Sequence, residues 1–178
     1  MITFQEYLGS KRACSTAHFW VKDKTVEEAV KDCPRGDWLL YLGVAANIDQ
    51  RQVMLARAHC VNTVRHLMEG ISSIMCVDYA IAYGEGRIAR EELVECAFSP
   101  CRDYADSAAD SLTSIMNSPV HSGCAASYAA NAAESAGSAN WFTTAKRAKQ
   151  RNEKKTADIC RKYIGQLIIT TVNQKIRE

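Results

Sequence analysis

Proline and glycine are scarce in this 178-residue chain, which has three and nine copies of them. These counts are too low for a β-sandwich, a collagen-like chain or a long disordered linker. Alanine, the residue with the highest helix propensity, occurs 25 times. The composition therefore predicts an all-α fold: a compact multi-helix bundle, or stacked helical hairpins, with an alanine-rich middle. The length and the 47% apolar content predict one helical domain over residues 1–178.

Long apolar runs are also missing. No stretch approaches the roughly 20 apolar residues that span a bilayer, and residues 1–20 carry charges at Glu6, Lys11 and Arg12 without the apolar block of a secretory signal. We therefore expect a cytoplasmic protein without a membrane partner. The sequence contains no P-loop, G-x-G-x-x-G turn, nucleophile elbow or H-E-x-x-H helix. This favours a protein that is not an enzyme and holds no cofactor.

The eight cysteines are expected to be reduced thiols, because the chain is long enough to build a core without disulfides. Cys60 comes shortly after Ala56 and Ala58, and Cys76 and Cys160 directly follow apolar residues, which is typical of small buried side chains. The only close pair is Cys96 and Cys101, and no second pair lies nearby to complete a zinc site.

Two histidines are the remaining candidates for a metal site. His59 and His66 are seven residues apart, so on one helix they would share a face. A metal would need a third ligand from elsewhere, and the sequence offers no clear candidate. We expect no metal and interpret both side chains as lying at a helix edge.

Helix start signals occur at three places. Thr25-Val-Glu-Glu28 has the form of a capping box and predicts a short helix to about Asp32. The following segment, CPRGD, breaks that helix, and Asp37 is predicted to be the N-cap of the next one. Asp49 is predicted to cap a helix of about five turns that Gly70 ends.

The later part of the chain is rich in alanine and serine. Ala125, Ala129 and Ala133 recur at four-residue spacing, which predicts close helix packing, either within one chain or between two chains of a homo-oligomer. The last helix is predicted to begin near Glu153 and to bury apolar residues at regular spacing. These residues are Ile159, Tyr163, Leu167 and Ile168.

The charges are strongly segregated along the chain. Residues 1–68 carry a net charge of +2, residues 69–138 of −7 and residues 139–178 of +7. Such asymmetry indicates either neutralisation within the fold or surfaces that steer charged partners.

An acidic stripe lies within the negative segment. Asp103, Asp106 and Asp110 have the i, i+3, i+7 spacing of one helix face. A solvated face is the ordinary interpretation, and the alternative is a docking surface for a basic partner.

A basic run lies within the positive segment. Residues 146–155 include six cations and one acid, with Trp141 and Phe142 just before them. The cations are Lys146, Arg147, Lys149, Arg151, Lys154 and Lys155. They could contact phosphates of a nucleic acid, but a hydrated junction between helices, or a counterpart to the acidic segment, is the favoured interpretation. A nucleic-acid partner is therefore a less favoured alternative.

Several motifs together resemble the immunity protein 5-like family of bacterial polymorphic-toxin systems. They span most of residues 13–164 and comprise Cys33–Leu42 (CPRGDWLLYL), Asp49 and Arg51 with Val53–Cys60 (VMLARAHC), Ala80–Gly86 (AIAYGEG), Glu91–Leu93 (EEL) and Thr156–Arg161 (TADICR). The resemblance implies an all-helical, non-enzymatic antidote that binds a cognate toxin.

The interpretation that follows is a protein that inhibits a cognate partner by covering it. Acidic residues Asp103, Asp106 and Asp110 are one predicted contact surface. Arg35 and Asp37 are a second, provided that their turn is exposed, because polar residues on a rigid loop are available to a partner. One alternative is a phage or mobile-element inhibitor of a host defence enzyme, and another is a nucleic-acid binder that uses the basic run.

Overall fold

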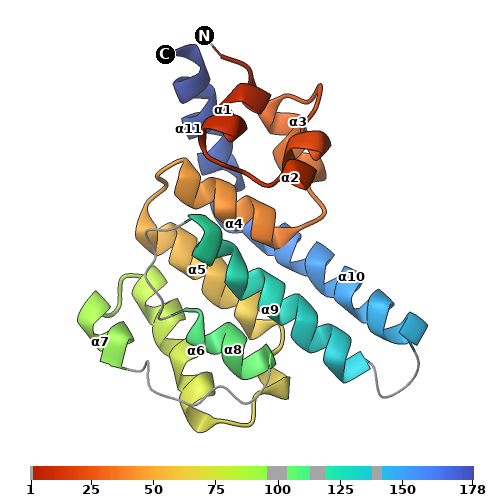
Figure 1. The fold of residues 1–178 in the computed structure, drawn as a ribbon. Coiled ribbons are helices and arrows are strands. Elements are labelled where there is room, and N and C mark those ends of the chain that lie inside the picture. The colour runs from red at the N-terminus through yellow and green to blue at the C-terminus, as the bar shows by residue number, and fades with distance from the viewer. Residues whose placement is uncertain (1, 96–103, 113–118, 138–141) are drawn as a thin grey trace.

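The computed structural model describes residues 2–95, 104–112, 119–137 and 142–178, and its regular elements in those ranges are all helical (Figure 1). This confirms the predicted all-α class. The elements are α1 (Phe4–Ser10), α2 (Ser15–Trp20), α3 (Val26–Asp32), α4 (Gly36–Ala45), α5 (Gln50–Asn62), a 3-10 turn (Arg65–Leu67), α6 (Ile71–Gly84), α7 (Arg90–Glu95), α8 (Tyr104–Asp110), α9 (Pro119–Gly137), α10 (Phe142–Cys160), a π turn (Arg161–Gly165) and α11 (Gln166–Arg177).

The helices form three groups along the long dimension of the molecule. Helices α1, α2, α3 and α11 lie at one end, together with both termini, and α6, α7 and α8 lie at the other (Figure 1). Between them α4, α5, α9 and α10 pack side by side. No helix within the described ranges is long and apolar enough to cross a membrane.

The alanine-rich helix α9 lies at the centre of the packing. It contacts α4, α5, α8 and α10, and Ala125 and Ala129 are completely buried. A helix that is buried on several sides needs small residues on several sides, because each Cβ sets how closely a neighbour approaches. The predicted close packing is confirmed, and these residues pack within a single chain.

Two of the three predicted helix starts are confirmed. Thr25 accepts a hydrogen bond from the Glu28 amide at 3.2 Å and donates its own amide to the Glu28 carboxylate at 2.9 Å, which completes the capping box of α3. Asp49 accepts from the amides of Arg51 and Gln52 and so caps α5.

The end of α5 differs from the prediction. The α-helix ends at Asn62, where the Thr63 hydroxyl donates to the carbonyl of Cys60 at 2.7 Å. Such a local side-chain bond competes with continued helix, and residues 65–67 form a 3-10 turn. The predicted five-turn helix was therefore too long, and Gly70 serves as the N-cap residue of α6.

The C-terminal part of the chain forms two helices joined without a break. Helix α10 begins eleven residues before the predicted start at Glu153, and the π turn leads from it into α11. The buried residues recur every four positions, at Cys160, Ile164, Ile168 and Val172. Leu167, predicted to be buried, is exposed, because it lies beside the four-residue stripe and about 100° around the helix from Ile168.

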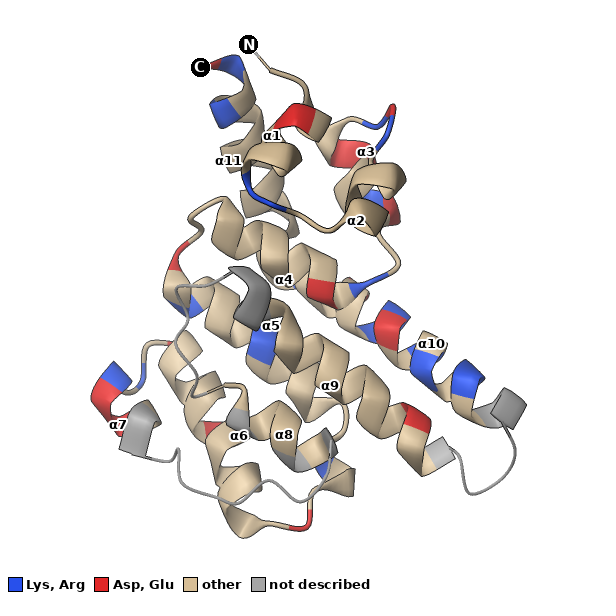
Figure 2. Ribbon diagram, in the orientation of Figure 1, with Lys and Arg blue, Asp and Glu red and all other residues tan. Residues whose placement is uncertain are grey.

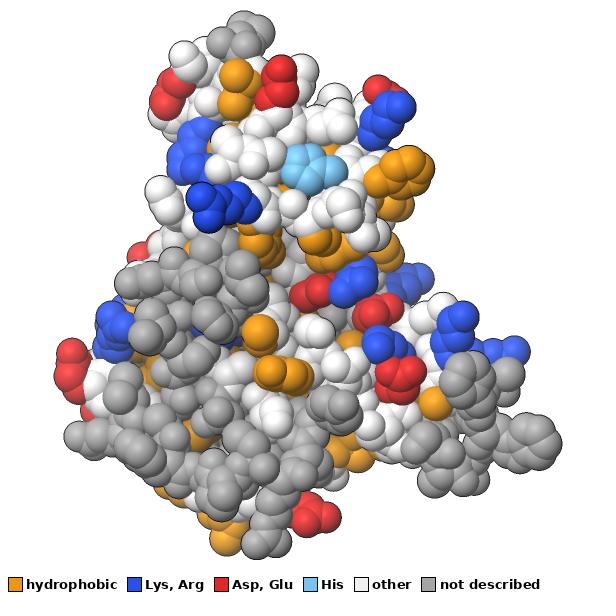
Figure 3. Space-filling view, in the orientation of Figure 1, with side chains coloured by type: hydrophobic (Ala, Val, Ile, Leu, Met, Phe, Trp, Pro, Cys, Tyr) orange, Lys and Arg blue, Asp and Glu red, His pale blue; other side chains and the backbone are white. Residues whose placement is uncertain are grey.

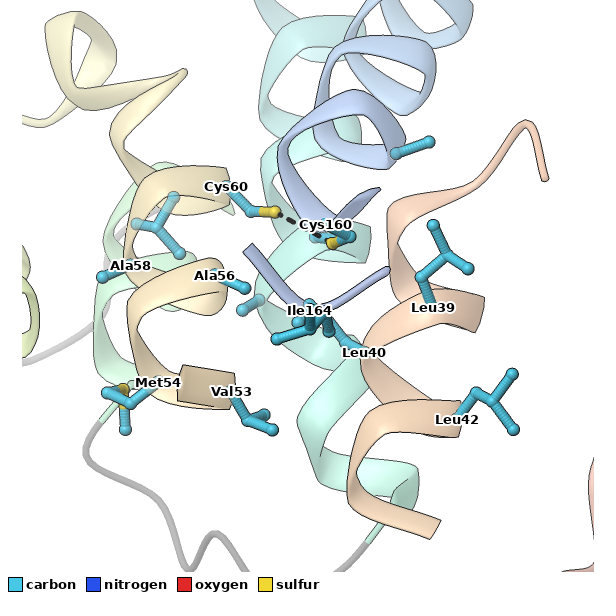
Figure 4. Packing of buried hydrophobic residues seen from close by; sticks show 14 of the residues in the cluster. Leu39, Leu40, Leu42, Val53, Met54, Ala56, Ala58, Cys60, Cys160 and Ile164 are labelled. Atoms are coloured by element: carbon cyan, nitrogen blue, oxygen red, sulfur yellow. Dashed lines mark hydrogen bonds between the residues drawn. The ribbon is translucent and has the colours of Figure 1, made fainter. Parts of the chain in front are cut away.

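The core is continuous across α4, α5, α9 and the π turn (Figure 4). Leu40, Met54 and Ile164 are fully buried there. Cys60 and Cys160, also fully buried, place their sulfur atoms 3.7 Å apart between α5 and α10. The predicted burial of these two thiols is confirmed, and neither of them forms a disulfide.

Candidate functional site

A cavity of about 430 Å³ lies where α1, α2 and α3 meet α4 and α9. Its size falls in the range of ligand and side-chain pockets. Most of the wall is apolar, with Leu8, Val21 and Leu39 among its residues. Figure 3 shows hydrophobic side chains gathered at this waist of the molecule, next to acidic and basic ones. The site therefore combines an apolar interior with charged groups beside it.

Two tryptophans form part of the cavity wall. The rings of Trp20 and Trp38 are 6.5 Å apart between centroids and tilted by 49°. The ammonium of Lys24 lies 3.6 Å from the centroid of Trp20, within cation–π range. The indole Nε1–H of Trp20 is buried and has no hydrogen-bond acceptor.

The charged pair of the cavity consists of the predicted partner-binding residues Arg35 and Asp37. The guanidinium donates from Nε to one carboxylate oxygen at 3.0 Å and from Nη2 to the other at 2.6 Å. These hydrogen bonds to Asp37 raise the pKa of Arg35 above its ordinary value. Arg35 also lies 5.0 Å from the ring centroid of Trp38. Both charged side chains are half-buried and line the cavity.

Asp37 was predicted to be the N-cap of α4, and this prediction was wrong. The helix begins at Gly36 with Arg35 as its N-cap residue, and no side chain caps it. Asp37 lies in the first turn, where a carboxylate is favoured by the helix dipole. Its two oxygens are engaged by Arg35, so they do not serve as a cap.

The predicted acidic stripe falls on residues whose side chains lie outside the described part of the chain. Asp103 lies outside the described residues, and so do the side chains of Asp106 and Asp110, although these two belong to α8. Their role as a contact surface stays a prediction.

The basic run lies in the middle of α10, so its interpretation as a junction between helices was wrong (Figure 2). Lys149 pairs with Glu134 of α9 at 2.8 Å, and it is half-buried. The other five cations are exposed and form no salt bridge with the described residues. Within the described ranges, the acidic segment 69–138 therefore neutralises only one of the six cations by a salt bridge.

The two histidines do not share a helix. His59 is on α5, whereas His66 is in the 3-10 turn that follows, so the predicted common face was wrong. The ring of His59 stacks on Tyr163 with 4.7 Å between centroids, and burial lowers the pKa of His59. In the part of the chain that the structure describes, no three His, Cys, Asp or Glu side chains are grouped to hold a metal ion.

The cysteine environments predict a sharp difference in reactivity. Cys14 is exposed, whereas Cys160 is fully buried, and this burial raises the pKa of its thiol. Because the thiolate is the nucleophile, iodoacetamide should modify Cys14 in the native protein and leave Cys60 and Cys160 unmodified. Peptide mass spectrometry before and after unfolding measures this. Modification of Cys60 or Cys160 at the rate of Cys14 would mean that α5 and α10 separate readily.

Sequence reasoning missed the cavity and the role of Trp20 in its wall. Trp20 and Trp38 lie on different short helices. Hydrophobic periodicity relates residues within one helix, so it does not predict that two residues of different helices are in contact. The available signal was the concentration of aromatic residues in the first 41 positions, which hold six of the fourteen Phe, Trp and Tyr side chains.

These features define an all-helical protein with an apolar cavity next to a charged pair. Comparison with protein-family models, with curated proteins and with solved structures gives no match for the chain.

Proposed function

We propose that this protein is a non-enzymatic binding protein that inhibits a cognate protein by covering it, as the resemblance to immunity proteins implies. The cavity between the N-terminal helices and α4 is the proposed centre of the interface. Its combination of an apolar, aromatic-lined interior with polar groups is the arrangement of a binding hot spot. The observation that carries this proposal is the position of Arg35 and Asp37 in the cavity wall.

The proposed occupant is a large apolar side chain of the partner. The cavity is wide enough for one such group, and Arg35 and Asp37 neutralise each other. The pair can therefore form hydrogen bonds with the partner. In addition, Arg35 can bind an acidic group of the partner, and Asp37 can bind a basic one. An apolar group that enters the cavity would displace water from Leu39 and its apolar neighbours, and this supplies the affinity.

The experiment begins with affinity capture from the native host and continues with the purified captured protein. Ala17 of α2 lines the cavity, and Ala17→Leu adds bulk without removing a contact. We expect this variant to bind the captured protein about thirty-fold more weakly, the effect of a hot-spot residue, and to inhibit it correspondingly less. Isothermal titration calorimetry measures the affinity.

Ala89→Leu is the matched control, because Ala89 is exposed and lies outside the cavity. The double variant Arg35→Ala/Asp37→Ala should weaken binding about ten-fold by loss of the polar contacts. If both cavity variants bind as tightly as the Ala89 control, the interface lies elsewhere. The Asp103→Asn/Asp106→Asn/Asp110→Asn variant then tests the predicted acidic surface through the salt dependence of the association rate.

The identity of the captured protein separates the two inhibitor alternatives. A toxin encoded beside this chain supports the immunity function, whereas a defence enzyme supports a phage or mobile-element inhibitor. Capture of nucleic acid and no protein would contradict both.

A further inference from the structure

A second hollow, of about 390 Å³, lies between the 3-10 turn, α9 and α10. It shares no lining residue with the cavity at Trp20 and Trp38. Its aliphatic part consists of Val64, Leu67, Ala133, Ala136 and Ala148. Its polar part consists of the following residues: Thr63, His66, Arg151, Asn152 and Lys155.

A chain of hydrogen bonds fixes the orientation of the Asn152 amide. The Thr63 hydroxyl has one hydrogen, which it donates to the carbonyl of Cys60 at 2.7 Å. Thr63 Oγ1 therefore accepts from Asn152, at 2.9 Å, and the atom that donates must be Nδ2. This leaves Oδ1 of Asn152 as an acceptor, and that atom is buried without a partner.

Asn152 is only 8% exposed, which makes the unpaired oxygen significant. Buried polar atoms in proteins are almost always hydrogen-bonded, and exceptions call for an explanation such as a ligand. An occupant of the hollow that brings an N–H group would supply the missing donor.

The charge of the hollow limits that occupant further. Arg151 and Lys155 are one turn apart on α10, both are exposed, and neither forms a salt bridge with the described residues. Glu153, the acid between them in sequence, lines a different hollow beside Arg35. Two uncompensated cations favour an anionic group and disfavour an ammonium group. The occupant should therefore carry a negative charge and a neutral N–H donor.

We propose that this hollow binds an acidic peptide segment of a partner protein. An aspartate or glutamate side chain pairs with Arg151 and Lys155, and a neighbouring main-chain N–H donates to Oδ1 of Asn152. Small aliphatic side chains of the segment pack against Ala133 and Ala136. Among the described residues, the lining includes no tryptophan, phenylalanine or tyrosine on which a nucleobase would stack, so the peptide is favoured over a nucleic acid.

The test uses the intact, 15N-labelled protein and needs no identified partner, so its result does not depend on the cavity proposed above. The probe is an N-acetylated, C-amidated hexapeptide of alternating alanine and glutamate. In a titration followed by amide chemical shifts, we expect the shifted signals to cluster at residues 63–67, at residues 148–155 and at the side-chain amide of Asn152.

Two comparisons distinguish specific binding in the hollow from nonspecific electrostatic attraction. Arg151→Gln/Lys155→Gln should weaken the peptide at least ten-fold, whereas Lys146→Gln/Arg147→Gln, an equal charge change on the same helix outside the hollow, should weaken it less than two-fold. A peptide with methylated main-chain nitrogens lacks the N–H donor and should also bind at least ten-fold more weakly to the unaltered protein.

The proposal is overturned by equal losses in the two double variants, by unchanged binding of the methylated peptide, or by shifts that do not reach the hollow. An oligothymidylate of the same net charge is the final arm of the test. If it binds the hollow more tightly than the peptide does, the site serves a nucleic acid instead.

Discussion

Replacing Gly36 with alanine is expected to lower the free energy of unfolding by about 3 kcal/mol, the upper part of the range for overpacked cores. Gly36 begins α4 and lies against Thr156 of α10. A Cβ built there lies 2.6 Å from Thr156 Oγ1 and 2.7 Å from the Thr156 carbonyl carbon. Because one of these atoms belongs to the backbone of α10, a side-chain rotation does not relieve the clash, and α4 must move. Urea unfolding followed by circular dichroism measures the change.

Gly165 provides the matched control for Gly36. It lies in the π turn with helical dihedral angles, and an added Cβ meets its nearest neighbour, Val30 Cγ1, at 3.5 Å. Alanine fits there and restricts the unfolded chain more than glycine does, so Gly165→Ala should raise the stability by about 0.5–1 kcal/mol. If both substitutions change stability by similar amounts, the contact between α4 and α10 is looser than described.

Replacing Arg57 with methionine is expected to raise the free energy of unfolding by about 2 kcal/mol. Arg57 on α5 is 1% exposed, its Nη2 donates to the carbonyl of Ser111, and its Nε has no partner. Burial lowers the pKa of Arg57 from 12.5 to about 10. This difference corresponds to a desolvation cost of about 3 kcal/mol at neutral pH. Methionine has a similar length and no charge, and it removes that cost at the expense of one hydrogen bond.

The destabilisation caused by burying the charge of Arg57 depends on pH. The folded chain releases the Arg57 proton at a lower pH than the unfolded chain does, so the penalty from this residue is complete below pH 10 and declines as the pH rises above it. Arg57→Lys keeps a charge and should be less stable than Arg57→Met. Urea unfolding at neutral pH measures the free energy of unfolding of the original chain and of the two variants. A methionine variant that is less stable than the original chain would mean that the buried charge is compensated.

Local signals in the sequence were sufficient for much of the helical framework. A capping box requires only four residues, so the start of α3 at Thr25 was predictable without tertiary information. Asp49 was predictable for the same reason. The small-residue spacing at Ala125 and Ala129 predicted close packing, because few other arrangements use so many alanines on one helix.

The errors arose where a tertiary contact or an irregular turn overrode the local pattern. Asp37 has the sequence position of a cap, but its carboxylate is bound by Arg35. Leu167 continues the apolar periodicity, but the π turn accommodates an additional residue and keeps Ile164 and Ile168 on the buried side. Neither the π turn nor the unpaired oxygen of Asn152 has a signature in the sequence, because both depend on the partners of each group in the folded chain.

The beginning and end of the chain are tied together, which has a consequence for biosynthesis. The amide of Ile2 donates to the carbonyl of Ile176 at 3.0 Å, and α11 also contacts α1 and α3 (Figure 1). Segments emerge from the ribosome in order, and domains fold as they become available. Helices α1 and α3 therefore lack this neighbour until α11 has been synthesised. The end of the molecule that α1, α2 and α3 share with α11 is therefore completed later than the central helices α4 and α5.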